Sequence, residues 1–296
     1  MKTVIVIGNG FDIDLGWDTS YRSFYEAHKG WKMHQTDEDD LFQHVIKHVE
    51  DNWFDFERTI YDYAIHRFNS NKIVERDLQD YNAFKGLLSN FLSKRSSEPV
   101  RNDSYAYQLL NAYINTSKRF LSNGNIILNW FSFNYTPIEN VARQIDPNVD
   151  FRYVPVHGTL EKNNIIFGIH DANQIMPEYR YLQKSMDDEY ESHGIVSSLM
   201  DANLIVLFGL SMGFIDGVYF KDVLTQISNV DNANNNKEIV FITKDNKTKR
   251  DIKNNLLDMG INTQVLFNTN KIEFILTSPE NIGTNKEKFA LLLSRL

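Results

Sequence analysis

Short apolar runs rich in β-branched residues recur along the chain, each bounded by glycine or polar residues. Runs of this kind, apolar at successive positions, are typical of strands that are buried on both faces of a parallel sheet. They predict five strands, at Thr3–Ile7, Ile126–Phe133, Phe151–Val156, Leu204–Phe208 and Glu238–Thr243. Two shorter candidate strands are Ile165–Phe167 and Thr263–Phe267. Helical stretches such as Pro137–Gln144 and Val218–Ile227 lie between most of the strands.

This alternation predicts an α/β fold with a doubly wound, mostly parallel sheet and right-handed crossovers. The region from about Tyr21 to Leu121 breaks the alternation, because its apolar residues recur at helical spacing and it contains no convincing strand. We therefore expect an α/β domain of residues 1–20 and 122–296, with a large helical insertion or cap formed by residues 21–121.

The composition excludes several classes of protein. The 296 residues include no cysteine, which rules out disulfides and thiolate zinc sites and favours a reducing compartment. The net charge is −8 and no basic stripe is visible, which argues against general nucleic-acid binding. No apolar stretch approaches the roughly 20 residues that span a bilayer. We expect a cytoplasmic protein without a membrane partner and without a metal.

The first predicted strand ends in the turn Gly8-Asn9-Gly10-Phe11-Asp12. Glycines at such a turn let backbone N–H groups approach a phosphate, so the turn predicts an anion site. The dinucleotide fingerprint would need a third glycine where this chain has Ile13, which disfavours an ordinary dehydrogenase. Two interpretations of Asp12 stay open: it caps the following helix or turn, or it reaches a ribose or an attacking water.

Three further predicted strands also end in polar or glycine residues. Asn134-Tyr135-Thr136, His157-Gly158 and Gly209-Leu210-Ser211 follow the strands that end near residues 133, 156 and 208. In an open parallel sheet the carboxyl ends of the strands share one edge, where the ligand crevice forms. We therefore predict that Asn134, His157, Ser211 and the first glycine turn face one cleft.

These motifs resemble those of the AbiH-type bacteriophage abortive-infection family. The turn at residues 7–12, with Gly16, Thr19, Tyr21 and Phe24, is similar to the opening signature of that family. Trp53 and Glu57 resemble a second element. The remaining matches are Phe133–Thr136 with Glu139, His157-Gly158, Phe167-Gly168, and Gly209–Ser211 with Asp216. The resemblance extends over residues 5–220.

The family in turn resembles a distant branch of the Sir2-like fold, which implies a Rossmann-like domain that binds NAD. By this resemblance Asn134 matches the asparagine beside the nicotinamide ribose, and His157 matches the catalytic histidine. Two features depart from Sir2 proteins: Thr136 stands where an acid is usual, and the four-cysteine zinc module is absent. The resemblance therefore implies NAD hydrolysis rather than protein deacylation.

We hypothesise that the chain is an antiphage NAD glycohydrolase, which cleaves the nicotinamide–ribose bond through an oxocarbenium-like state. The N–H groups of Gly8, Asn9, Gly10 and Phe11 would bind the pyrophosphate, and the family match adds Gly209, Ser211 and Asp216 to the binding residues. In catalysis, Asn134 would orient the ribose hydroxyls or the water, His157 would be the general base, and Asp12 would stabilise positive charge.

Other functions stay open at this point. One alternative is a non-catalytic nucleotide-binding sensor of a defence system, which the threonine at position 136 favours. Another is a hydrolase or transferase that acts on a different phosphorylated small molecule. A nuclease is disfavoured, since no cluster of carboxylates with a lysine follows a strand. The expected partner is a small nucleotide, and a phage-derived trigger and a homo-oligomer are left open.

Overall fold

The computed structural model forms two compact units. The first comprises Met1–Trp17, Pro99–Val156 and His193–Leu296, and the second comprises Asp18–Glu98 and His157–Ser192. The structure describes residues 2–28, 41–48, 56–120, 127–171, 174–191, 193–213, 215–229 and 236–296. The units divide the chain differently from the predicted domains, because residues 99–121 belong to the first unit and residues 157–192 to the second.

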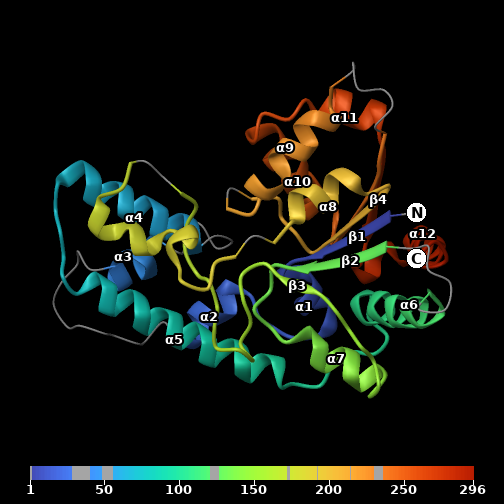
Figure 1. Cartoon of the computed structure of the whole chain (residues 1–296), viewed down its shortest axis with the longest axis horizontal. Coiled ribbons are helices and arrows are strands. Elements are labelled where there is room, and N and C mark those ends of the chain that lie inside the picture. The colour runs from blue at the N-terminus through green and yellow to red at the C-terminus, as the bar shows by residue number, and fades with distance from the viewer. Residues whose placement is uncertain are drawn as a thin grey trace. The chain divides into compact units, whose positions relative to one another are not determined.

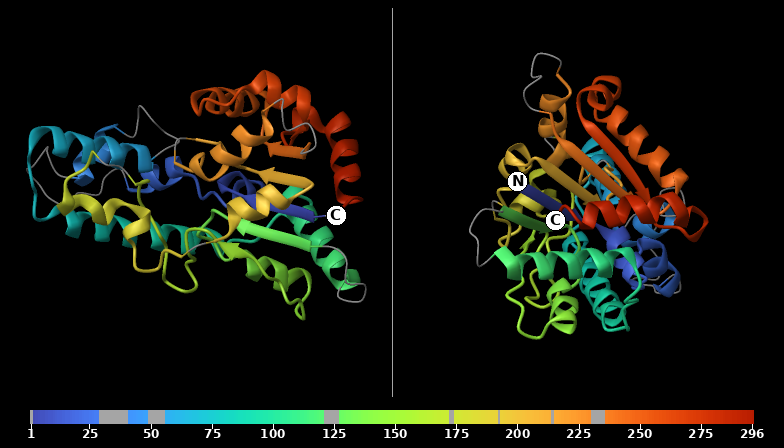
Figure 2. Two further views of the ribbon diagram at one scale, coloured as in Figure 1. Left: turned by 45° about the horizontal axis from the view of Figure 1, so that its top comes forward. Right: turned by 90° about the vertical axis from the view of Figure 1, so that its right-hand side faces the viewer.

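The first unit is built on a six-stranded sheet (Figures 1 and 2). Its strands are β1 (Lys2–Ile7), β2 (Ile127–Ser132), β3 (Val154–Pro155), β4 (Leu204–Phe208), β5 (Glu238–Thr243) and β6 (Lys271–Leu276). All neighbouring strands are parallel, and their order is β3-β2-β1-β4-β5-β6. The β1 strand (dark blue) therefore lies between β2 and β4, as both views of Figure 2 show.

This strand order is that of a doubly wound, Rossmann-like sheet. The α/β fold predicted from the sequence is therefore confirmed. The chain reverses its direction of winding between β1 and β4, because β2 and β3 are added on one side of β1 and the later strands on the other. In sheets of this type the crevice for a ligand lies beside the carboxyl ends of the two strands at the reversal.

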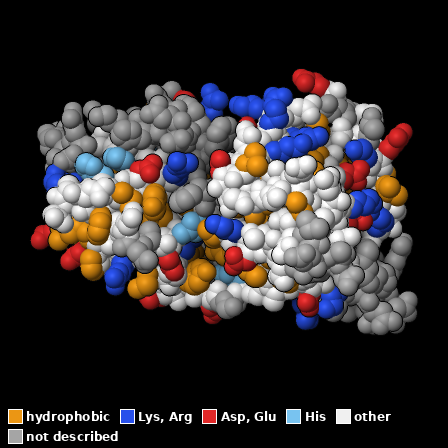
Figure 3. Space-filling model, turned by 90° about the horizontal axis from the view of Figure 1, so that it is seen from above, with side chains coloured by type: hydrophobic (Ala, Val, Ile, Leu, Met, Phe, Trp, Pro, Cys, Tyr) orange, Lys and Arg blue, Asp and Glu red, His pale blue; other side chains and the backbone are white. Residues whose placement is uncertain are grey.

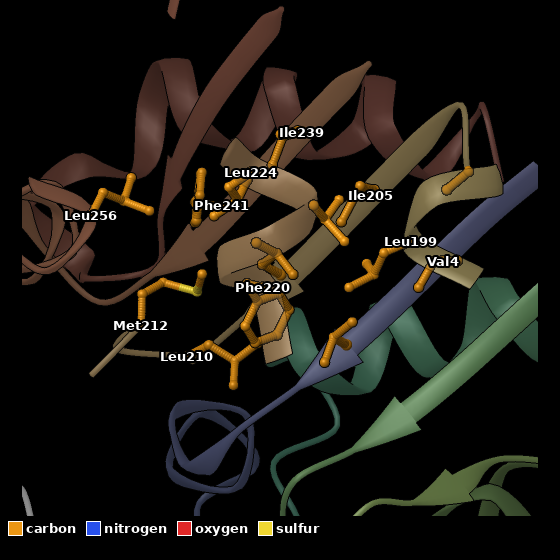
Figure 4. Close-up of a cluster of buried hydrophobic side chains, with 14 of the residues drawn as sticks. Val4, Leu199, Ile205, Leu210, Met212, Phe220, Leu224, Ile239, Phe241 and Leu256 are labelled. Carbon is orange, nitrogen blue, oxygen red and sulfur yellow. The ribbon is translucent and has the colours of Figure 1, made fainter. Parts of the chain in front are cut away.

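Helices cover both faces of the sheet, and the side chains of each strand alternate between two apolar clusters. Val4 and Val6 belong to the cluster shown in Figure 4, whereas Ile5 and Ile7 belong to the cluster on the opposite face. The first cluster is covered by α8 (Ile195–Asp201), α9 (Val218–Ile227), α10 (Asn246–Asp258) and α11 (Thr263–Thr269). The opposite cluster is covered by α1 (Asn9–Leu15), α6 (Tyr105–Phe120), α7 (Ile138–Ile145) and α12 (Ile282–Leu293). A short 3₁₀ helix, η4, spans Pro279–Asn281.

The second unit is helical. It contains α2 (Tyr21–His28), α3 (Leu41–His48), α4 (Phe56–Ser70), α5 (Asp77–Ser96) and the 3₁₀ helices η1 (Pro177–Leu182) and η2 (Lys184–Met186). Its described residues form no strand, only an isolated bridge between Ile169 and Gln183. Aromatic side chains fill its interior, where the ring of Phe24 contacts those of Phe56, Phe84 and Phe91.

Three of the predicted strands are wrong in whole or in part. Thr263–Phe267 lies in α11, because Asn262 caps that helix by accepting a hydrogen bond from the amide of Val265. Ile165–Phe167 is buried but forms no strand. Of Phe151–Val156, only Val154–Pro155 pairs with β2. The edge strand β6 was missed, because Lys271 and Glu273 interrupt its apolar pattern.

The amino terminus of α10 provides a simple test of local stability. Asp245 caps this helix, with Oδ1 accepting from the amide of Thr248 at 2.8 Å. We expect Asp245→Ala to lower the free energy of unfolding at pH 7 by about 1 kcal/mol. Urea denaturation followed by circular dichroism measures this loss. As a control, Asp251→Ala removes an exposed carboxylate from the body of the same helix and should change stability by less than about 0.5 kcal/mol.

The loss should depend on pH. The backbone hydrogen bond from Thr248 holds the pKa of Asp245 below its usual value of 3.8. A carboxylate whose pKa is lower in the folded state stabilises the fold above its unfolded pKa, and this stabilisation disappears as pH falls through the folded pKa. The wild type and Asp245→Ala should therefore converge in stability as the pH falls through the lowered pKa of Asp245. An equal difference at pH 7 and in acid would contradict the capping role.

Candidate functional site

The loops that follow β1 and β4 pack directly against each other at the carboxyl edge of the sheet in the first unit. The amide of Gly8 donates to the carbonyl of Phe208 (N···O 2.9 Å), and the amide of Gly10 donates to the carbonyl of Gly209 (3.0 Å). A Cβ atom on Gly10 would lie 2.6 Å from Cα of Gly209, and one on Gly8 would lie 2.7 Å from Cδ2 of Leu210. Gly10 therefore needs to be glycine, because its contact is with backbone, whereas a side chain at position 8 would have to displace the end of the Leu210 side chain.

This packing changes the role expected for the glycine turn. The amide of Phe11 donates to the carbonyl of Gly8 at 2.8 Å, so the amides of Gly8, Gly10 and Phe11 all have partners within the first unit. They are therefore not preformed donors for a pyrophosphate, because an anion would have to displace existing hydrogen bonds. Ligand binding at the turn stays a prediction, and the exposed residue Asn9 is the part of the turn best placed for it.

Asp12 lies at the centre of a buried polar cluster in the first unit. Its Oδ1 accepts from Nδ2 of Asn134 at 2.8 Å, and its Oδ2 accepts from the hydroxyl of Thr136 at 2.8 Å. An ionised carboxylate only accepts hydrogen bonds, which matches these two donors. Thr136 is thus a hydrogen-bond partner of Asp12. The carboxylate of this cluster is supplied by Asp12 in α1 and not by position 136.

The side chain of Asn134 is oriented by these contacts. Its Nδ2 donates to Asp12 and also to the carbonyl of Gly8 at 3.0 Å. Both partners can only accept, so the amide orientation is fixed and both Nδ2 protons are used. Among the described residues, none donates a hydrogen bond to Oδ1 of Asn134. This oxygen can therefore accept a hydrogen bond from a ligand or a water.

The Thr136–Asp12 hydrogen bond can be tested by a substitution that keeps the shape of the side chain. Thr136→Val removes the hydroxyl and leaves a buried carboxylate oxygen without this donor, which should lower the free energy of unfolding by about 1–3 kcal/mol. Thr3→Val is the matched control, because the hydroxyl of Thr3 is buried in β1 and has no hydrogen-bond partner among the described residues. We expect Thr3→Val to be neutral or stabilising in urea denaturation. Equal losses in the two variants would contradict the assignment.

The loop after β4 contains one residue with a strained backbone, Met212. Gly209 and Met212 have left-handed backbone conformations, with φ of 67° and 56°. A residue other than glycine costs about 1–3 kcal/mol in such a conformation, and strain of this kind concentrates at functional sites. Met212 is held by burial in the apolar cluster of Figure 4. Ser211, between the two, is exposed, with its hydroxyl accepting from the amide of Gly213 at 3.2 Å, and Asp216 is half-buried.

His157 belongs to the second unit, where a tight turn fixes its backbone. The amide of Ile166 donates to the carbonyl of His157 at 2.8 Å. Gly158 has a φ of 72°, and a Cβ atom there would lie 1.9 Å from the carbonyl oxygen of Asn164. Glycine is therefore required after His157 for the geometry of the turn. This structural reason is sufficient to account for the His-Gly pair in the sequence.

The side chain of His157 lies in a buried cluster with Lys184 and Glu57, which we call the His157–Lys184–Glu57 cluster. Nζ of Lys184 lies 3.2 Å from Nε2 of His157 and 3.0 and 3.2 Å from the two carboxylate oxygens of Glu57. The exposed fractions of the three residues are 3%, 3% and 7%. Lys184 is the first residue of η2, and its amide donates to the carbonyl of Ile169 at 2.9 Å.

The Phe167-Gly168 pair has a structural role in the second unit. The hydroxyl of Tyr81 donates to the carbonyl of Phe167, and burial raises the pKa of the Tyr81 phenol, with the charges of Asp187 and Glu57 adding to the effect. A Cβ atom on Gly168 would lie 2.3 Å from the carbonyl oxygen of Leu182. Glycine is thus needed where residues 167–169 run beside η1 and η2.

A second buried charge cluster connects α4, α5 and η1. Arg67 and Asp77 are both 0% exposed, and Nε of Arg67 lies 3.6 Å from Oδ2 of Asp77. The hydroxyls of Tyr63 and Tyr179 donate to the same oxygen at 2.5 and 2.8 Å. Burial raises the pKa of Asp77, and these hydrogen bonds and Arg67 oppose the rise. Burial also raises the pKa of Tyr179 to about 12.

The structure thus brings together some of the predicted site residues. The first unit contains Asp12, Asn134 and Ser211 together with the two glycine loops, and the second contains His157. A common pocket for Asn134 and His157 stays a prediction. Trp53 lies outside the described residues. Sequence reasoning missed Lys184 and the Arg67–Asp77 pair, because an isolated charged residue in a polar segment carries no sign of burial.

On the face shown in Figure 3, several Lys and Arg side chains lie close together near the upper middle of the view, and others are dispersed among acidic and neutral ones. None of the helices in the described ranges is long and apolar enough to cross a membrane. The described residues also include no group of three or more His, Asp or Glu side chains placed to hold a metal ion.

The fold and the buried polar cluster of Asp12, Asn134 and Thr136 define a class of protein. It is an α/β protein with a doubly wound parallel sheet and a buried polar cluster at the carboxyl edge of that sheet. The family model described as bacteriophage abortive infection AbiH matches residues 4–236. The chain belongs to this family, and membership suggests an antiphage abortive-infection role. A search of curated proteins found no match.

Proposed function

We propose that this AbiH protein binds NAD at the carboxyl edge of its sheet and hydrolyses the nicotinamide–ribose bond. The observation that carries the proposal is the acceptor oxygen of Asn134, held in place by Asp12 and the Gly8 carbonyl beside the reversal of the sheet. Ligands of doubly wound sheets bind at this edge. A ribose hydroxyl or a water can donate a hydrogen bond to Oδ1 of Asn134.

The charge of the cluster suits this reaction. Cleavage of the bond develops positive charge on the ribose as the nicotinamide leaves, as in glycoside hydrolysis. Buried, oriented groups stabilise such charge better than water does, because they need no reorganisation. The Asp12 carboxylate and the Asn134 carbonyl are groups of this kind. We assign to Asp12 the electrostatic role and to Asn134 the orientation of the ribose hydroxyls or the water.

The remaining roles follow the sequence resemblance. We assign contacts with the pyrophosphate to Asn9 and Ser211, which are exposed in the loops after β1 and β4. Asp216 is assigned a contact with the same nucleotide. Hydrolysis also needs a group that accepts a proton from the attacking water, and His157 is the proposed general base. In this proposal the activity depletes NAD and thereby aborts phage infection.

The proposal is tested by adding NAD to the purified protein and measuring free nicotinamide, in parallel with NAD levels in expressing cells with and without phage infection. We expect Asn134→Ala to abolish or strongly reduce nicotinamide release. Asn129→Ala is the matched control, because Asn129 lies within β2 itself and Nδ2 of its side chain contacts the Ser198 hydroxyl at 3.4 Å. NAD binding without release in either setting would favour the nucleotide sensor, and absence of binding would overturn both functions.

A further inference from the structure

The His157–Lys184–Glu57 cluster contains a lysine to which the proposed function assigns no role. We propose that Lys184, anchored by Glu57, is a positioning residue that holds His157 as the neutral tautomer with its proton on Nδ1. The inference rests on the proposed function only for its relevance to catalysis, since the protonation state of the ring can be observed without NAD.

The hydrogen-bonding capacity of the two side chains determines the tautomer. A lysine ammonium has three N–H donors and no acceptor. Nζ of Lys184 is within hydrogen-bond distance of Nε2 of His157, at 3.2 Å. Nε2 must therefore supply the lone pair for this bond, so the ring proton lies on Nδ1. The opposite tautomer would turn an N–H group of the ring toward a group that cannot accept.

The charges in the cluster favour the same state. Lys184 is 3% exposed, and its carboxylate partner Glu57 contacts it through both oxygens, at 3.0 and 3.2 Å. Buried charges need such pairing, which keeps the lysine in its ammonium form. An imidazolium at position 157 would place a second cation 3.2 Å from this ammonium, and two like charges at this distance repel each other. The cluster therefore favours a neutral ring.

Each member has a distinct role in this arrangement. Glu57, in the first turn of α4, holds the charge and position of Lys184. Lys184, at the start of η2, orients the ring of His157 and determines which nitrogen carries the proton. A general base must be neutral before it accepts a proton. In the Nδ1–H tautomer the only lone pair of the ring is on Nε2, so the proton from water goes to Nε2 as its hydrogen bond from Lys184 breaks, and the ammonium stays paired with Glu57. Lys184 thus acts on the reaction through His157.

The direct test is nitrogen NMR of protein labelled with ¹⁵N in its histidine rings. The chain has eight histidines, so the His157 signals are assigned as those missing from the spectrum of His157→Gln. We expect the wild-type ring at pH 7 to be neutral, with the proton on Nδ1. An imidazolium, or a ring protonated only on Nε2, would overturn the inference without a need for any variant of Lys184.

Variants test the role of Lys184 itself. In Lys184→Met the donor is lost, and we expect His157 to shift toward the Nε2–H tautomer or the imidazolium, whereas Lys184→Arg, which retains a donor, should preserve Nδ1–H. Lys85→Met is the matched control, because Lys85 pairs with Asp187 at 3.0 Å in the same unit, outside the cluster. Circular dichroism confirms that the variants are folded. An unchanged His157 tautomer in folded Lys184→Met would contradict the proposal.

Activity assays complete the test and separate it from the proposed function. If the protein releases nicotinamide, Lys184→Met should lower kcat on the order of 10-fold or more with little change in KM, because a histidine base in the wrong tautomer loses turnover. Lys184→Arg should restore most of this rate. A wild-type protein with an Nδ1–H ring but no NAD hydrolysis would overturn the proposed function and leave the inference about Lys184 standing.

Discussion

Replacing His157 by alanine should lower the rate of nicotinamide release from NAD by about 10²–10⁴, the range that a general base contributes. The substitution removes the group proposed to accept a proton from the attacking water. It should act on kcat more than on KM, because the ring acts on the reacting atoms rather than on the bulk of the nucleotide. Steady-state kinetics with purified protein provide both constants.

The matched control is His66→Ala. His66 lies on the exposed side of α4, in the same unit as His157, so the same chemical change is made away from the cluster. We expect this variant to retain the wild-type rate. A folded His157→Ala protein that hydrolysed NAD as fast as His66→Ala would show that His157 is not the base.

Arg67→Met should lower the free energy of unfolding by about 3–5 kcal/mol, because it leaves the carboxylate of Asp77 buried without its cation. Asp77 is fully buried, and the hydrogen bonds from Tyr63 and Tyr179 would be its remaining described donors. Loss of Arg67 also removes one of the influences that oppose the raised pKa of Asp77. Urea denaturation followed by far-ultraviolet circular dichroism measures the loss.

Two further variants make this prediction specific. Arg95→Met removes a partner of the Arg95–Glu98 pair, whose side chains are 31% and 41% exposed, and should cost less than about 1 kcal/mol. The double variant Arg67→Met/Asp77→Leu removes both buried charges and should be more stable than Arg67→Met alone. A loss in Arg67→Met no larger than that in Arg95→Met would contradict the importance of the buried pair.

Much of the first unit follows from local sequence patterns. The strands β1, β2, β4 and β5 were predicted because they are buried on both faces and therefore consist of unbroken apolar, β-branched runs. The edge strand β6 is not buried in this way, and the charged residues Lys271 and Glu273 interrupt its apolar pattern, so the sequence does not predict it. The opposite error occurs at α11. The apolar residues Val265 and Phe267 fit a strand pattern, but the segment is a helix whose first turn is capped by the side chain of Asn262.

The candidate site was predicted only in part, for a related reason. Asn134 and the glycine loops follow predicted strands, so the parallel topology alone brings them to one edge. The partners of Asp12 could not be predicted, because a hydrogen bond between α1 and the residues after β2 depends on tertiary packing. Lys184 and Arg67 illustrate the same limit, since the burial of a charged side chain is decided by residues distant in the sequence.

The proposed hydrolysis requires a dinucleotide to bind beside Asn134. Titrating the ¹⁵N-labelled protein with a carba analogue of NAD, which cannot be hydrolysed at the nicotinamide–ribose bond, tests this binding. The side-chain amide signals of Asn134, assigned from Asn134→Ala, should shift and saturate, whereas those of Asn129 should not. Unchanged Asn134 signals at a high concentration of the analogue would contradict the claim.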